Sequence, residues 1–146
     1  MTWLWVMLAG GVGSVLRYLM VLGHEAFLRS RRRPVSVDDE TLPTVTGTFV
    51  VNVVGALVMG VVIAATGAME AQPVLTTGLL GGFTTFSAAS LETARDWRAG
   101  RRLRGILIPV AMMVACVLAF WVGLMAPGPA VCAVAAGSPV CAVFVR

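Results

Sequence analysis

The sequence predicts an all-α membrane protein with four transmembrane helices, and two observations carry that prediction. The chain of 146 residues is 58% hydrophobic and only 12% charged, whereas a soluble domain averages about 25% charged residues. Four stretches, 3–28, 44–68, 73–94 and 105–125, are mostly apolar, and each is long enough for a bilayer, which takes about 20 residues of helix. Lipid cannot hydrogen-bond an open backbone, so each span is expected to be a helix.

The loops between these spans hold most of the charge. The net charge of +4 arises without any lysine. Arginines in short loops between apolar runs are typical of membrane proteins, which disfavours a nucleic-acid-binding surface. We expect residues 1–126 to form one membrane domain, and the apolar tail 127–146, interrupted by proline and glycine, to be disordered or to lie on a surface.

The first span carries a positive charge at membrane depth. Its glycine-rich stretch Gly10 to Ser14 leads into Arg17 and Tyr18. The glycines allow helix backbones to approach closely. An unpaired charge in lipid is expensive, so we expect Arg17 to face the protein interior or water. The structural alternative is that its long side chain reaches back to the membrane interface.

The second span has a narrow stripe of small and polar residues. Thr48, Asn52, Ala56 and Gly60 are spaced by four and therefore share one helix face. An amide at membrane depth needs a hydrogen-bond partner. Asn52 either bonds a neighbouring helix as structural glue or offers its amide hydrogens to a passing anion, and this span alone does not decide between the two.

The third span contains residues that weaken a helix in mid-membrane. Gly81 and Gly82 are followed closely by Thr84, Thr85 and Ser87. Non-helical backbone survives in a bilayer only where protein or a cavity shelters it, and carbonyls freed at such a break can coordinate a cation. We predict a broken helix near Gly81–Thr85. The alternative is a continuous helix with a glycine-rich packing face.

No acidic residue lies at the centre of a predicted span, since Glu25 and Glu92 are near span ends. Transporters coupled to protons or cations generally need an acid within the membrane. Here the charge at membrane depth is positive and several other polar groups are hydrogen-bond donors. This pattern favours an anion as the transported species.

Three motifs together resemble the CrcB/Fluc family of bacterial fluoride channels. The matching stretches run from Gly10 to Tyr18, from Gly47 to Gly55, and from Gly81 to Ser87 with a further match at Ser90. The likeness covers roughly residues 9–126. It implies a non-enzymatic channel in the bacterial inner membrane, built as an antiparallel dimer of four-helix subunits with two narrow pores at the interface.

The resemblance also implies a set of pore residues. Asn52 would line the pore, and Phe86 would contact fluoride through its ring edge, the positive side of the aromatic quadrupole. Ser87 would be a polar pore residue. We expect Thr48 and Thr85 to contribute to the same lining.

The resemblance also implies a metal site, and the chain departs from the family in two respects. The carbonyls of Gly81 and Thr84 match those that hold a structural sodium ion at the dimer axis, while Arg17 would serve architecture or ion access. Ala89 stands where the family has a second phenylalanine, and Ala88 replaces the threonine before it. The fourth span also lacks the serines that continue the family's polar track. This subunit would therefore supply only part of a pore lining.

The distribution of arginine predicts one fixed orientation. Nine of the eleven arginines lie in the first and third loops, which must share one side of the membrane. The positive-inside rule places these loops in the cytoplasm and both termini outside it. An antiparallel dimer then calls for a distinct homologous subunit of opposite bias. Two alternatives remain open: a four-helix exporter of organic cations, and a non-conducting partner subunit of a heterodimeric channel.

Overall fold

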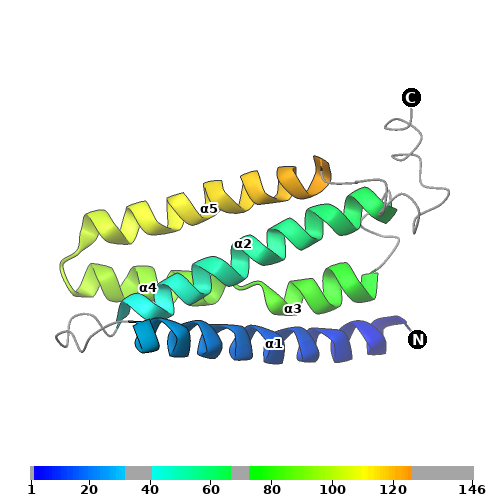
Figure 1. Ribbon diagram of the computed structural model, residues 1–146, viewed down its shortest axis with the longest axis horizontal. Helices are drawn as coiled ribbons and strands as arrows, with labels where there is room; N and C mark the ends of the chain where they lie inside the picture. The colour runs from blue at the N-terminus through cyan, green and yellow to red at the C-terminus, as the bar shows by residue number, and fades with distance from the viewer. Residues whose placement is uncertain (1, 32–40, 67–72, 126–146) are drawn as a thin grey trace.

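In a computed structural model, which describes residues 2–31, 41–66 and 73–125, the regular secondary structure is entirely helical. In chain order the elements are α1 (Thr2–Arg31), α2 (Thr41–Thr66), the π-helical turn η3 (Val74–Leu80), α3 (Gly81–Phe83), α4 (Phe86–Arg98) and α5 (Arg102–Met125) (Figure 1). Four helical stretches are long and apolar enough to cross a membrane, which confirms the predicted fold class. The tail 127–146 lies outside the described residues.

The helices extend beyond the predicted spans at their arginine-rich ends. The first span continues to Arg31, and the third to Arg98. Arg95 and Arg98 therefore lie in the last turn of α4, not in a loop as the sequence analysis placed them. Cationic side chains interact favourably with the partial negative charge at a helix C-terminus, which explains why the helix continues through them.

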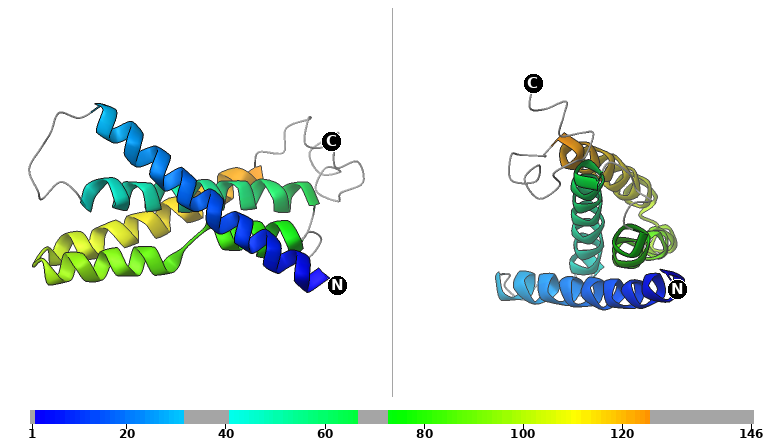
Figure 2. Two further views of the ribbon diagram at one scale, coloured as in Figure 1. Left: turned by 90° about the horizontal axis from the view of Figure 1, so that it is seen from below. Right: turned by 90° about the vertical axis from the view of Figure 1, so that its right-hand side faces the viewer.

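The helices run lengthwise in an elongated molecule, so their ends gather at two poles. The end of α1, the start of α2, the end of α4 and the start of α5 lie at one pole (Figure 1). Helix α5 packs on α2 and α4, whereas α1 packs on η3 and α3 and crosses the other helices obliquely (Figure 2). The ends that carry most of the arginines therefore share one side of the molecule.

Glycines mark the two closest helix crossings. A Cβ atom on Gly13 of α1 would collide with the carbonyl oxygen of Leu79 in η3. At the crossing of α2 and α5, a Cβ on Gly60 or Gly123 would lie 3.0 Å from the Cα of the other. Small residues thus let the backbones meet, and Gly60 ends the stripe of small and polar residues against α5.

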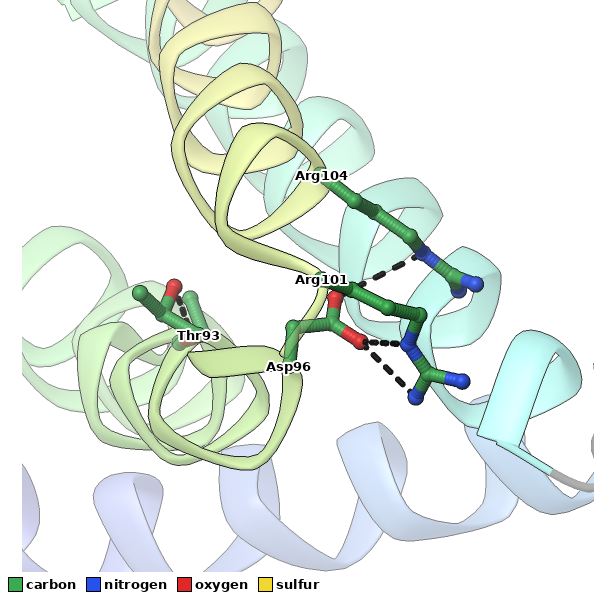
Figure 3. Close-up of polar contacts among 5 residues, drawn as sticks. Thr93, Asp96, Arg101 and Arg104 are labelled. Atoms are coloured by element: carbon green, nitrogen blue, oxygen red, sulfur yellow. Dashed lines mark hydrogen bonds and ion pairs between the residues drawn. The ribbon is translucent and has the colours of Figure 1, made fainter. Parts of the chain in front are cut away.

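A buried carboxylate closes the tight turn between α4 and α5. Asp96, which is only 5% exposed, accepts bonds from Nε and Nη2 of Arg101, both at 3.0 Å, and pairs with Nε of Arg104 at 3.4 Å (Figure 3). Gly100 supplies the positive φ of 76° that the turn requires. Two guanidinium groups offset the cost of burying this charge, so the end of α4 is fixed to the start of α5.

Candidate functional site

Two residues leave the helical conformation between α3 and α4. Thr84 (φ −76°, ψ 156°) and Thr85 (φ −149°, ψ 124°) are extended. The side-chain oxygen of Thr85 accepts a hydrogen bond from the backbone N–H of Ala88 at 3.3 Å, so Thr85 caps the start of α4. The N–H of Thr84 still bonds the carbonyl of Leu80, but the N–H of Thr85 and the carbonyl of Thr84 need partners outside the helices.

Asn52 of α2 supplies those partners for Thr85. Its Oδ1 accepts the backbone N–H of Thr85 at 2.8 Å, and its Nδ2 donates to the carbonyl of Thr85 at 3.0 Å. In a continuous helix the Thr85 N–H would instead bond the carbonyl of Gly81. Asn52 is only 7% exposed, and its side chain replaces the helical bond that the Thr85 N–H lacks. This is the structural role considered for Asn52, in which its amide bonds a neighbouring helix.

The second hydrogen of the same amide has a weaker partner. Nδ2 of Asn52 also contacts Sδ of Met112 in α5 at 3.4 Å. A thioether sulfur is a weak hydrogen-bond acceptor. This hydrogen is thus the part of the Asn52 amide for which an incoming anion competes most easily.

Arg17 turns inward to the same segment. Its Nη1 donates to the carbonyl of Thr84 at 3.3 Å, while the N–H and hydroxyl of Thr84 both donate to the carbonyl of Leu80 at 3.0 Å. Ser14, one turn before Arg17, donates to the carbonyl of Gly82 at 3.3 Å. Of the two interpretations of Arg17, the structure shows the one in which it faces the protein interior.

Thr48 makes a contact that the sequence analysis missed. This residue is 3% exposed, and its hydroxyl donates to Oε1 of Glu92 in α4 at 2.7 Å. The sequence did contain a signal for it. Asn52 lies against Thr85, and α2 and α4 run in opposite directions (Figure 1). Thr48 is one turn before Asn52, and Glu92 is two turns after Thr85, so both residues lie toward the same end of the molecule and on the facing sides of the two helices.

The predicted pore residues divide between two open cavities. One, here called the apolar cavity, has a volume of about 690 Å³ and is lined by Asn52, Thr84, Thr85, Phe86, Ala89 and Met112 among others. The second, the arginine cavity, has a volume of about 460 Å³ and is lined by Ser14, Arg17, Thr48, Thr85, Ser87, Glu92 and Arg95 among others. Thr85 borders both cavities, so the extended segment lies between them.

Phe86 and Ser87 begin α4 with their side chains largely outside the subunit. Phe86 is 85% exposed, although it lies within a membrane-spanning segment. The hydroxyl of Ser87 lies 3.1 Å from that of Thr85. Gly81, at the start of α3, is exposed as well. The structure thus holds Asn52 and Thr85 together by two hydrogen bonds. The side chain of Phe86 instead projects from the surface of the subunit.

Among the described residues, this site offers a metal ion backbone carbonyls and single side-chain oxygens, and no cluster of the usual metal-binding side chains. No group of three or more histidine, cysteine or acidic side chains that could hold a metal ion occurs in the part of the chain that the structure describes. Two positive side chains, Arg17 and Arg95, and one carboxylate, Glu92, border the arginine cavity. Two guanidinium groups outnumber the one carboxylate, which also accepts a hydrogen bond from Thr48, so the net charge along this cavity is positive.

Four helices long and apolar enough to cross a membrane make this a multi-pass membrane protein. The helix discontinuity places polar groups within the membrane, between two open cavities. The profile of the family described as CrcB-like protein, Camphor Resistance (CrcB), matches residues 4–124. The chain belongs to this family, which confirms the resemblance found in the sequence.

Three relatives illustrate the similarity. The fluoride-specific ion channel FluC 2 of Cutibacterium acnes is 42% identical over 130 residues, which cover 85% of this chain and 95% of the relative. The fluoride-specific ion channel FluC 1 of Leifsonia xyli subsp. xyli is 37% identical over 129 residues, covering 85% and 88%. The fluoride-specific ion channel FluC of Geobacter sulfurreducens is 36% identical over 122 residues, covering 80% and 89%.

Proposed function

We propose that this chain is a subunit of a passive fluoride channel, which lets fluoride leave the cytoplasm and so lowers its toxicity. The observation that carries the proposal is the amide of Asn52. It lies at the helix discontinuity beside an open cavity, and one of its hydrogens is held only by a thioether. A small anion is a far stronger acceptor than sulfur. The names of the relatives support fluoride as that anion.

A partner subunit would complete the pathway. The exposed ring of Phe86 cannot line a pore within its own subunit, because little of its surface contacts this chain. In an antiparallel dimer, the Phe86 edge would instead face the pore formed with the partner, where its positive rim favours an anion. Thr85 and Ser87 would add hydroxyl groups along the same path.

The substrate class is testable in vesicles. Vesicles that contain the chain with its natural partner subunit, loaded separately with fluoride, chloride or a fluorescent quaternary ammonium ion, are expected to release fluoride alone. Release of the organic cation would favour the exporter. Assembly with the partner but release of none of the three would identify a non-conducting subunit. Ala88 and Ala89 favour this alternative, because they lack the side chains that the family has at these positions.

The backbone at the discontinuity fits a sodium ion. Asn52 takes the N–H that would otherwise bond the carbonyl of Gly81, so that oxygen is released for another partner. The carbonyl of Thr84 accepts from Arg17 and has a second lone pair. We propose that Gly81 and Thr84 of two subunits together hold one sodium ion at the dimer axis, where its charge would fix the interrupted helices.

Sodium is therefore expected to stabilise the assembled protein. Replacing potassium with sodium at constant ionic strength should raise the melting temperature of the purified dimer, because the ion binds only the assembled state. Replacing potassium with lithium or an organic cation should not reproduce the increase. Equal melting temperatures in all four salts would contradict the site, independently of whether fluoride is conducted.

A further inference from the structure

We propose that Met112 is a movable cover on Asn52: its thioether occupies the position on the amide that a fluoride ion takes, and moves aside when the ion arrives. The inference rests on the proposed function, and it adds a residue that determines how tightly the site holds fluoride. Its starting point is the contact of 3.4 Å between Nδ2 of Asn52 and Sδ of Met112.

The two hydrogens of Asn52 Nδ2 are not equivalent. One is held by the carbonyl of Thr85 at 3.0 Å, a strong acceptor that also belongs to the structural clamp. The other meets only sulfur. A donor in an apolar cavity gains from any acceptor, so Met112 satisfies it between ions. Since a thioether accepts weakly, a fluoride ion displaces it without disturbing the bonds to Thr85.

The surroundings of Met112 leave it room to move. Met112 borders the apolar cavity and also a small cavity of about 10 Å³, roughly the space of one water-sized group. Ala89 borders both cavities as well. A methionine side chain has three rotatable bonds and adapts readily to irregular space.

Leucine at position 112 tests the cover, because it keeps the volume and removes the acceptor. In Met112→Leu the amide hydrogen is unsatisfied at rest, so binding an anion gains more. The fluoride concentration for half-maximal flux is expected to fall about threefold, the value of a weak hydrogen bond. Met113→Leu makes the same chemical change at the next residue of α5, which also lines the apolar cavity and is 64% exposed. Because the contact with Asn52 is made by Met112, Met113→Leu controls for a changed cavity lining and should leave that concentration unchanged.

A resting-state measurement separates this inference from the proposed function. Asn52 is the only asparagine in the chain, so selective ¹⁵N-asparagine labelling gives a single side-chain amide group in NMR spectra, with any partner left unlabelled. Without fluoride, one of its two proton signals should move in Met112→Leu and stay in place in Met113→Leu. Fluoride should then shift that signal at lower concentration in Met112→Leu than in the wild type.

Each outcome decides the matter. An unchanged amide signal in Met112→Leu would overturn the cover even if the channel conducts. An equal or higher half-maximal fluoride concentration in that variant would overturn it as well. If the wild type carries no fluoride but the amide signal still moves in Met112→Leu, the proposed function would be contradicted while the contact between Met112 and Asn52 would stand.

Discussion

Replacing Asn52 with leucine is expected to reduce fluoride flux by more than about tenfold, because both the clamp on Thr85 and the donor to the anion are lost. The variant leaves the N–H and carbonyl of Thr85 without the two partners seen at 2.8 and 3.0 Å. Flux is measured with a fluoride electrode on vesicles of matched protein content. Size-exclusion chromatography should give the wild-type elution profile, since the close packing of α2 on α5 through Gly60 and Gly123 within the subunit does not involve Asn52.

A second variant separates the two roles of Asn52. Asn52→Asp keeps an oxygen that can accept the Thr85 N–H but has no amide hydrogens to offer an anion. If Asn52 is a donor to fluoride, this variant should lose flux as severely as Asn52→Leu, because it offers no amide hydrogen and its carboxylate, when ionised, also repels the anion. Wild-type flux in Asn52→Asp would show that the residue serves only to bond α2 to the discontinuity, and wild-type flux in Asn52→Leu would remove it from the pathway altogether.

Nearly all copies of the chain are expected to insert in one orientation. The helix ends that carry most of the arginines gather at one pole of the molecule, and the positive-inside rule places that pole in the cytoplasm. Paired reporters that are active only inside or only outside the cytoplasm, fused after Arg146, should place the C-terminus outside. Reporter activity on both sides in similar amounts would refute a fixed orientation.

A fixed orientation has a large consequence for activity. If the active form is antiparallel, this chain purified alone should give fluoride flux lower by about tenfold or more than the chain co-expressed with a homologue of opposite arginine bias, because one copy would have to insert against that bias. A variant with its arginines redistributed between the two sides of the membrane provides the control. Replacing Arg98 and Arg102, which line neither cavity, with glutamine while adding arginines to the second loop should produce both orientations and restore flux to the single chain. Full flux from the unaltered chain alone would exclude the need for a partner.

The sequence predicted the membrane spans well, because lipid imposes two strong conditions on a spanning segment. The segment must be long enough to cross the bilayer, and its backbone groups must bond one another. The helix ends were less predictable. Arg95 and Arg98 are charged, which suggested a loop, yet a helix C-terminus favours positive charge and continues into the interface. The π-helical turn Val74–Leu80 was not predicted at all, since it depends on how that segment packs against α1.

The polar site was predictable as a set of residues but not as a network. Depth in the membrane was enough to single out Asn52 and Arg17, because unpaired polar groups are costly there. Their partners required knowledge of which helix faces meet. Asn52 meets Thr85 because α2 packs beside the start of α4. Met112 reaches the same amide from α5, a helix whose sequence shows no polar track.

The central claim is that fluoride crosses as a bare anion down its gradient, and one measurement tests it most directly. Vesicles containing the chain with its partner are loaded with potassium fluoride and diluted into fluoride-free buffer without a proton gradient. A passive channel soon builds a membrane potential, so release should remain slight until valinomycin lets potassium follow, and should then proceed rapidly. Release that needs no potassium pathway, or that requires a proton gradient, would contradict the account.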